Sequence, residues 1–371
     1  MTAIAAVAAA AAVLSLACLA ANLVAFRPLP AGVSAPRWPR VSVVIPARNE
    51  ERDLEAALRS HRESDYPDLE VIVVDDRSGD RTGEIARRFA AEDPRFRAIA
   101  GQDPPSGWLG KPHALRQGAR AASGEWLLFA DADVVYEPDV VRRAVADAVR
   151  RRLALLCLLP RFETHGFWEG VVMPNLYALL YLGPGFVTQI GRVKALAGGS
   201  GSGNLVARGA YDAVGGHEAI RSAVIDDIGL ALAMKRAGQR TRAATAYEGV
   251  RVRMYRGLRE MVDGFSKNVA FLGPPVPALL FPLAFFALAL APWIVLAAPA
   301  PSAAKALAAA AIGATLAGRA VVARVTRSPA WSALFHPLMI AVWTGIAMRS
   351  WWRRVVRKRF EWRGRVTDAP K

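Results

Sequence analysis

Residues 3–26 contain no charged side chain, and this uncharged run constrains the fold more than any other feature of the sequence. About 20 apolar residues are enough to cross a lipid bilayer. A cleaved signal peptide is the alternative, but it would need a basic start, and the first charge is Arg27, after the run. We therefore expect a retained anchor over residues 1–27, with its N-terminus outside and with Arg37 and Arg40 on the cytoplasmic side.

A second apolar region is expected over residues 271–348. The second of its three candidate spans is weakened by a charge near each end, and the third is broken by a His-Pro pair. The spans are residues 277–298, 303–322 and 328–348.

A basic tail occupies residues 349–371, with eight Lys and Arg side chains between Arg349 and Arg365. Basic residues beside membrane spans favour the cytoplasmic side. Two C-terminal crossings would keep the tail inside, whereas three would put it outside. We expect two full crossings, with the remaining segment re-entrant or interfacial, although the sequence does not settle which one fails to cross. The chain is thus expected to be a multi-pass protein of the inner membrane with its middle domain in the cytoplasm.

The composition is strongly basic, with 48 Lys and Arg residues against 32 Asp and Glu residues, a net charge of +16. Such a charge can indicate a nucleic-acid ligand or a membrane surface. No aromatic-basic pattern or nucleic-acid motif accompanies it, so we expect membrane lipids as partners and no nucleic acid. Cys18 and Cys157 both lie in apolar runs and are interpreted as small buried residues rather than as a disulfide or metal site.

Residues 40–270 alternate short apolar runs with segments of helical character, which predicts an α/β doubly wound, mostly parallel sheet. Ligands of such sheets bind beyond the carboxyl ends of the strands. The expected strands are residues 41–46, 70–76, 96–100 and 125–130, and the expected helices are 50–64, 81–91 and 112–122.

Acidic residues follow three of these strands, and the most notable are Asp131 and Asp133, directly after an apolar run. Two carboxylates one residue apart repel each other unless something positive lies between them. At this spacing they can bind a hard divalent cation, Mg²⁺ or Mn²⁺, which in turn bridges to phosphate oxygens. A single carboxylate at a strand end could equally cap the next helix, but three such ends at one edge of a sheet favour a site.

Six ordered motifs resemble those of family 2 glycosyltransferases, which have the GT-A fold. They are "VSVVIPARNEE", "VIVVDDRSGDRT", "GWLGKPHAL", "FADADV", "GSGNLVARGAY" and "IDDIGLALAMKRAG". The resemblance implies an inverting transfer of a sugar from a nucleotide sugar, expected to be UDP-linked. It also assigns a set of residues to the nucleotide sugar, and these are Pro46, Asn49, Glu50, Asp75, Asp76, Ser78, Lys111 and Asp131.

The same resemblance implies that Asp131 and Asp133 hold the metal and that the second acid of the Asp226-Asp227 pair is the general base. Direct displacement at an anomeric carbon needs a carboxylate to take the proton of the acceptor. It also needs a cation to stabilise the leaving diphosphate. Asp227 opens an amphipathic helix, so simple capping of that helix is the alternative for this residue.

Three further residues are expected on the acceptor side, Gly203, Asn204 and Lys267. The first two lie in "GGSGSGN", which is interpreted either as a flexible loop or as a loop that approaches the sugar. Lys267 lies in "DGFSKNVAF" (residues 263–271), where processive synthases carry Q-x-x-R-W. This version resembles bacterial lipid glycosyltransferases associated with carotenoid or hopanoid pathways. Lys267 is our candidate for a phosphate contact there, and a lysine that reaches the membrane interface is the alternative. The histidines show no ligand spacing, so none is assigned a role.

Two classes of function remain open from the sequence. The first is a membrane enzyme that glycosylates a lipid, whose acceptor could be fed from the bilayer by the apolar segment 168–186; that segment could also be a core helix. A processive polysaccharide synthase is a variant of this class, disfavoured by the missing Q-x-x-R-W and the few crossings. The second class is a non-catalytic membrane scaffold that keeps the fold, although the retained acids disfavour it.

Overall fold

A computed structural model describes residues 1–268, 275–357, 359–362 and 365–368 of the chain. The chain divides into two compact units. The sheet unit comprises Phe26–Arg161 and Val187–Arg253, and the helical unit comprises Met1–Ala25, Phe162–Phe186 and Met254–Lys371.

The sheet unit is built around a seven-stranded, mostly parallel sheet of strand order β3-β2-β1-β4-β8-β6-β9. Only β8 runs antiparallel to its neighbours, β4 and β6. Its strands are β1 (Val41–Ala47), β2 (Leu69–Asp75), β3 (Phe96–Ala100), β4 (Trp126–Phe129), β6 (Leu155–Leu159), β8 (Asn204–Ala207) and β9 (Thr241–Thr245), with β5 (Val134–Tyr136) and β10 (Val250–Val252) paired outside the sheet. Its helices are α2 (Leu54–Arg62), α3 (Thr82–Glu92), α4 (Gly110–Ala121), α5 (Val140–Arg150), α8 (Arg208–Ala213), α9 (Gly216–Ala219) and α10 (Asp226–Arg236).

The predicted mixed α/β fold with a mostly parallel sheet is confirmed, and all four predicted strands form with small shifts at their ends. Apart from the partly buried Pro46, the apolar side chains of β1 and β2 are buried because parallel strands pack on both faces. The helix predicted from residue 50 begins only at Leu54. Asn49 has a left-handed φ of 53°, so the chain turns after β1 before the helix can start. Cys157 is a buried free cysteine in β6, and Cys18 is a partly buried free cysteine.

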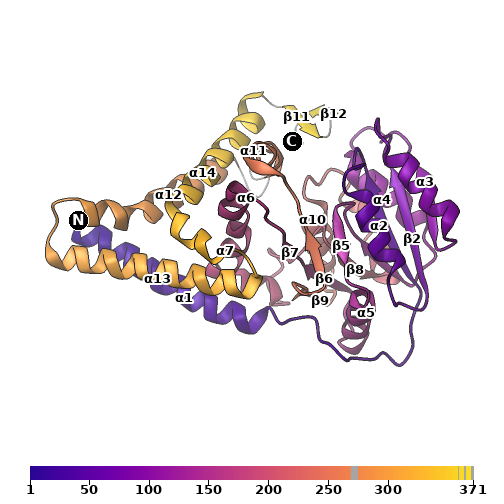
Figure 1. Cartoon of the computed structure of the whole chain (residues 1–371), viewed down its shortest axis with the longest axis horizontal. Helices are drawn as coiled ribbons and strands as arrows, with labels where there is room; N and C mark the ends of the chain where they lie inside the picture. The colour runs from indigo at the N-terminus through magenta and orange to yellow at the C-terminus, as the bar shows by residue number, and fades with distance from the viewer. Residues whose placement is uncertain (269–274, 358, 363–364, 369–371) are drawn as a thin grey trace. The chain divides into compact units, whose positions relative to one another are not determined.

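The helical unit gathers segments that are far apart in the sequence. Its helices are α1 (Thr2–Ala25), α6 (Phe167–Val172), α7 (Pro174–Leu182), α11 (Gly257–Asn268), α12 (Pro275–Ala297), α13 (Ser302–Thr326), η3 (Ala330–Phe335), α14 (His336–Trp352) and η4 (Arg353–Arg357), with the hairpin β11 (Arg359–Trp362) and β12 (Arg365–Asp368). Two short elements, β7 (Arg161–Phe162) and η1 (Gly185–Gln189), span the joins between the units. Figure 1 shows α1 and α13 running side by side, and the alanines at 8, 12 and 311 lie in their contact.

Four helices are long and apolar enough to cross a membrane by length and composition: Thr2–Ala25, Val276–Ala297, Ser302–Thr326 and Ala330–Val356. They include all three predicted C-terminal spans. The expectation of two full C-terminal crossings therefore stays a prediction, as does the orientation of the chain.

The domain predicted over residues 40–270 differs from the units of the structure. Residues 162–186 and 254–268 group with the long apolar helices instead of with the sheet, and residues 269–270 lie outside the described ranges. The segment predicted at 168–186 forms α6 and α7, and α7 packs against α1 and α13. Residues 168–186 carry one acidic side chain, Glu169, and are otherwise mostly apolar, and such a segment packs best against other apolar helices.

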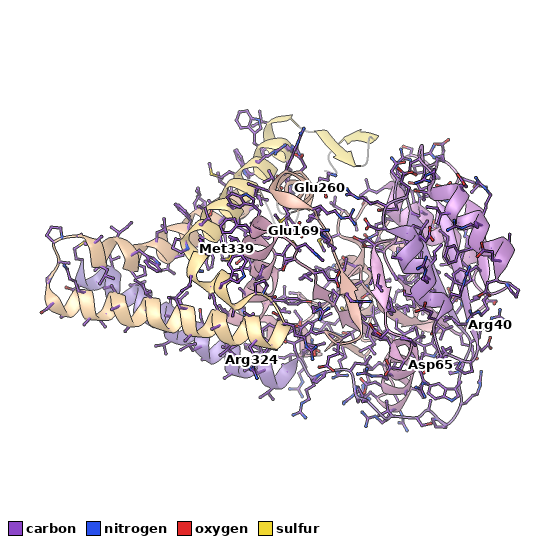
Figure 2. The ribbon with its side chains drawn as sticks, viewed as in Figure 1. Arg40, Asp65, Glu169, Glu260, Arg324 and Met339 are labelled. Atoms are coloured by element: carbon purple, nitrogen blue, oxygen red, sulfur yellow. The ribbon has the colours of Figure 1, made fainter. Side chains whose placement is uncertain are left out.

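Polar side chains tie these helices together at their ends. The buried amide of Asn22 in α1 donates to the carbonyls of Tyr181 and Gly183, both at 2.8 Å, and so satisfies the C-terminal end of α7. Buried Glu169 in α6 accepts the backbone N–H of Gly257 at 3.1 Å, which joins α6 to the start of α11. Figure 2 labels Glu169 beside Glu260, a residue of α11.

The orientation of the tail can be tested by thiol labelling. Val356 is half-exposed, and Val356→Cys in a Cys18→Ala background should resist a membrane-impermeant maleimide in intact cells and react after permeabilisation. Cys157 is fully buried and should stay silent throughout. Labelling of intact cells would overturn the two-crossing topology.

Candidate active site

The segments that follow β1, β2 and β4 meet at one edge of the sheet. Ala47 pairs with Asp75 in the parallel register of β1 and β2. On the other side of β1, the backbone N–H of Ala130 donates to the carbonyl of Val44 at 3.2 Å. The acids that the sequence placed after these strands are therefore neighbours in space, as expected for parallel strands.

The predicted nucleotide-binding residues form a hydrogen-bonded pair of loops after β1 and β2. The Ser78 hydroxyl accepts the backbone N–H of Asn49 at 3.0 Å, and the Asn49 side-chain oxygen accepts that of Gly79 at 2.9 Å. The Asp75 carboxylate accepts the backbone N–H of Ser78 at 3.0 Å. These bonds hold the left-handed conformation of Arg77, whose φ is 56°. Strained backbone of this kind persists only where its surroundings determine it, and it clusters at functional sites.

Asp76 is the most buried acid of these loops, with only 2% of its surface exposed. Burial raises its pKa to about 6, although the charges of Arg48 and Arg77 act in the opposite direction. Pro46 lies inside β1 opposite Val74.

Glu50 completes the predicted nucleotide set. Its backbone N–H donates to the hydroxyl of Thr82 at 2.7 Å, which attaches the loop after β1 to the start of α3. The predicted nucleotide residues of β1, β2 and their loops are therefore brought together by the structure.

A positive group lies between the acids of the predicted catalytic motifs, and it is Lys111. Its Nζ is 2.8 Å from Oδ1 of Asp131 and 3.2 Å from Oδ1 of Asp226. Lys111 comes from the first turn of α4, and Asp226 opens α10. Burial would lower the pKa of Lys111, but the carboxylates of Asp131, Asp226 and Asp227 outweigh it and raise that pKa well above its ordinary value. The ammonium ion is therefore a permanent counter-charge of the site.

Asp227, the predicted general base, is the second residue of α10. Burial, reinforced by the charge of Asp226, raises its pKa to about 6 against the opposing charge of Lys111. Its Oδ1 also accepts the backbone N–H of Ile228 at 2.8 Å. A carboxyl group with this pKa is ionised at neutral pH and is more basic than an ordinary aspartate, which suits proton abstraction.

The glycine-rich loop before β8 lies directly against these acids. A Cβ on Gly201 would lie 2.2 Å from Oδ2 of Asp131, and one on Gly199 would lie 2.4 Å from the carbonyl oxygen of Asp227. The loop therefore requires glycine because larger residues would displace the acids. Asn204 is buried, and its side-chain nitrogen donates to the Asp227 carbonyl at 3.0 Å. Gly203 lies against the Tyr136 hydroxyl, so the loop is fixed at both ends.

Asp131 and Asp133 flank the turn between β4 and β5, and both are partly exposed. Among the described residues, no group of three or more His, Cys, Asp or Glu side chains could hold a metal ion. Two carboxylates nevertheless fit the predicted Mg²⁺ or Mn²⁺, because such ions are commonly held by one or two carboxylates together with substrate phosphates. Lys267 belongs to the helical unit, near the end of α11, and its predicted phosphate contact stays a prediction.

One pocket of the sheet unit is lined by most of these groups. It is also lined by a residue to which the sequence pattern assigns no role. That residue is His217, which lies in α9. Burial, with the charge of Lys111, lowers its pKa to about 3. A single histidine after a glycine pair gives no ligand spacing, so only the three-dimensional structure could find it. The pocket is lined by Lys111, Leu115, Phe129, Ala130, Asp131, Ser200, Gly201, Asn204, His217, Asp226, Asp227 and Leu230.

Comparisons with known proteins support a glycosyltransferase domain. Residues 42–214 match the sequence model of Glycosyl transferase family 2, so the chain contains a domain of that family. A 4,4'-diaponeurosporenoate glycosyltransferase of Staphylococcus haemolyticus (strain JCSC1435) is 29% identical over 237 residues, which cover 62% of this chain and 61% of that protein. The protein of the same name from Staphylococcus aureus (strain USA300) is 29% identical over 238 residues, 62% of this chain and 60% of that one. The chain thus matches about three fifths of the length of these relatives.

A solved structure shares the fold. The mannosyltransferase PcManGT from Pyrobaculum calidifontis, in complex with GDP-Man and Mn²⁺, superposes with a TM-score of 0.51 and 22% identity. The match covers 95% of this chain and 99% of that chain. It supports the assignment of the GT-A fold that the ordered motifs predicted.

Proposed function

We propose that this chain, which contains a glycosyl transferase family 2 domain, transfers a sugar from a nucleotide sugar to the hydroxyl group of a lipid with inversion at the anomeric carbon. The observation that carries the proposal is the arrangement of Lys111 among Asp131, Asp226 and Asp227 in one pocket. It combines a fixed positive charge for a leaving diphosphate with a carboxylate of raised pKa for an acceptor proton.

The donor is bound along the edge of the sheet. The loops that carry Asn49, Asp76 and Ser78 hold the nucleoside. The ammonium of Lys111, which lies beside Asp131, attracts the diphosphate. A preorganised cation stabilises charge that develops on the leaving group without any rearrangement during the reaction. Asp226 keeps that cation in place from the opposite side.

Asp227 acts as the general base of the displacement. It takes the proton of the acceptor hydroxyl while the acceptor oxygen forms its bond to the anomeric carbon. The bond from that carbon to the diphosphate oxygen breaks, and the electron pair leaves with the diphosphate. Because the new bond forms on the face opposite to the leaving group, the configuration at the anomeric carbon inverts.

Asp131 and Asp133 are the residues that would hold Mg²⁺ or Mn²⁺. When bound, the ion neutralises charge on the diphosphate as a Lewis acid. We expect activity to vanish in excess EDTA and to return with Mn²⁺ or Mg²⁺, measured as release of nucleoside diphosphate. Asp133→Asn should raise the metal concentration needed for half-maximal activity, whereas Asp68→Asn, which changes an exposed acid just before β2 and outside the pocket lining, should leave it unchanged. Full activity in excess chelator would exclude a metal at this pair.

A lipid acceptor is supported by the relatives and by the helical unit. The relatives are named as diaponeurosporenoate glycosyltransferases. The described residues include four helices that could span a membrane, and the apolar helix α7 packs among them. This composition suits an acceptor that stays in the bilayer.

The proposal is tested with the full chain purified in detergent and reconstituted with bacterial lipid extract. UDP-glucose, UDP-galactose, UDP-N-acetylglucosamine and GDP-mannose are supplied in turn, and both nucleotide release and lipid products are measured by mass spectrometry. A single sugar on a lipid supports the proposal. A growing polymer would indicate a processive synthase instead, and the absence of turnover and of nucleotide binding would indicate a scaffold.

A further inference from the structure

His217 lines the pocket together with Lys111, Asp226 and Asp227, yet the mechanism above gives it no task. Its ring packs edge-on against Phe129 of β4, with 4.7 Å between ring centroids. An imidazole at this position is close to the reacting groups, so its protonation state decides what it can offer to a ligand.

Tyr211 fixes the tautomer of His217. The Tyr211 hydroxyl accepts the backbone N–H of His217 at 3.1 Å and lies 2.8 Å from Nδ1 of the same residue. Both side chains are buried. Within the described parts of the chain, Nδ1 of His217 is the acceptor within reach of the Tyr211 hydroxyl proton. A buried hydroxyl proton needs an acceptor, so the phenol donates to Nδ1 and the ring carries its own proton on Nε2.

The surrounding backbone is built to hold this pair. Gly216 has a φ of 51°, and a Cβ there would lie 2.4 Å from the ring of Tyr211. A side chain at residue 216 would therefore push the phenol away from the imidazole. The position of His217 depends on a packed arrangement and not on a mobile loop.

Nε2–H is then the group through which His217 can donate a hydrogen bond to a ligand in the pocket. In the described part of the chain no hydrogen bond involving Nε2 is found, and His217 lines the pocket with 1% of its surface exposed. We propose that His217 is a specificity-determining residue, which donates a hydrogen bond from Nε2 to one hydroxyl of the donor sugar. This inference rests on the proposed glycosyl transfer and adds the group that distinguishes one sugar from another.

A sugar hydroxyl suits this donor better than the diphosphate does. The diphosphate is served by the Lys111 charge, whereas His217 is held neutral and supplies one directional N–H. A neutral N–H donor pairs well with a neutral hydroxyl oxygen that lies in a fixed direction. Sugar epimers differ in the direction of one hydroxyl, so such a donor can distinguish them. A site built to bond a hydroxyl also discriminates against the analogue that lacks it.

The test begins with the sugar nucleotide that the wild-type protein turns over fastest among the four probes above. Its monodeoxy analogues are then compared by kcat/KM for wild type and for His217→Phe, which keeps a flat ring and removes the N–H. We expect His217→Phe to lose about tenfold on the parent sugar, the effect of one hydrogen bond, and to lose nothing on one deoxy analogue. His217→Gln, which retains an N–H donor, should recover part of the parent activity.

Binding of UDP or GDP alone is the matched control, because the nucleoside diphosphate has no sugar for His217 to contact. Its Kd should be the same in wild type and variants. An equal loss on every analogue, or a weaker Kd for the nucleoside diphosphate, would overturn the inference. If His217→Phe fails to fold, Tyr211→Phe carries the test, since release of the tautomer must weaken discrimination at the same single hydroxyl. Unchanged discrimination in that variant refutes the role of His217, whereas no turnover by wild type refutes the proposed function itself.

Discussion

Asp227→Asn is expected to lower sugar transfer by about 10²–10⁴-fold or more, because the amide cannot accept the acceptor proton. Affinity for the nucleotide sugar should survive, since Asp76 is unchanged and Lys111 keeps its direct ion pairs with Asp131 and Asp226. In wild type the activity should fall as the pH drops below about 6, where Asp227 becomes protonated. The measurements are kcat, KM and donor Kd for wild type and variant between pH 5 and 8.

The same substitution should stabilise the sheet unit at neutral pH. The pKa of Asp227 is about 6 in the folded chain against an ordinary value of 3.8. Between these values the folded state holds a proton that the unfolded state has lost, so wild-type stability falls as the pH rises through this range. Asparagine does not ionise, so the variant does not lose stability in this way as the pH rises. Above pH 6, we expect the thermal unfolding midpoint of Asp227→Asn to exceed that of wild type by about 2–4 °C for each kcal/mol of stability gained. Near pH 4 the two midpoints should be the same.

Asp226→Asn is the matched comparison, because it changes the adjacent acid of the same helix. Its Oδ1 lies 3.2 Å from Nζ of Lys111, so its loss should loosen that cation and weaken donor binding while leaving a base in place. The decrease in kcat should therefore be smaller than for Asp227→Asn. If Asp227→Asn transfers almost normally and Asp226→Asn is inactive, the base is Asp226. If both remain active, the base lies elsewhere.

The fold was largely predictable because its strands carry their own signal. Val71, Ile72, Val73 and Val74 are fully buried and β-branched, and such a run reads as a parallel strand from sequence alone. By contrast, β8 was not predicted. Its four residues, Asn204–Ala207, follow a glycine-rich loop and depend on β4 and β6 on either side, which are distant in sequence. Short central strands of this kind are defined by their neighbours.

The candidate site was predictable where a residue type determines the chemistry. Asp131 was singled out because two carboxylates directly after an apolar strand have few tasks, whereas Asp226, Asp227 and Lys111 were assigned by resemblance. What the sequence did not reveal was that Lys111 lies between two of them, since α4 and α10 are more than 100 residues apart. His217 was missed for a related reason. Its importance comes from Tyr211 and from the pocket, and neither leaves a spacing that can be recognised.

Lys111→Met is expected to have the second largest effect, because it removes the counter-charge that three carboxylates share. Methionine has a similar length and no charge, so the packing of α4 is disturbed little. Donor affinity should fall, since the diphosphate would meet Asp131 and Asp226 without an ammonium between them. Nucleotide-sugar Kd by calorimetry is the direct measurement. Lys194→Met, which changes a lysine of the same unit outside the pocket lining, is the control.

The pH dependence of Lys111→Met gives the sign of the electrostatic effect. The Lys111 charge lowers the pKa of Asp227, so its removal should move the acid limb of the activity profile above pH 6. The folded-state pKa of Asp227 rises further, and stability lost at neutral pH should be regained as the pH falls and Asp227 takes up a proton. Leaving a buried charge without its partner is strongly destabilising, whereas removing both partners can be nearly neutral. The double variant Lys111→Met with Asp226→Asn should therefore be more stable than Lys111→Met alone at pH 7.5. If the double variant is instead less stable by the sum of the two single effects, Lys111 and Asp226 do not interact, and the ammonium is not the group that holds these acids together.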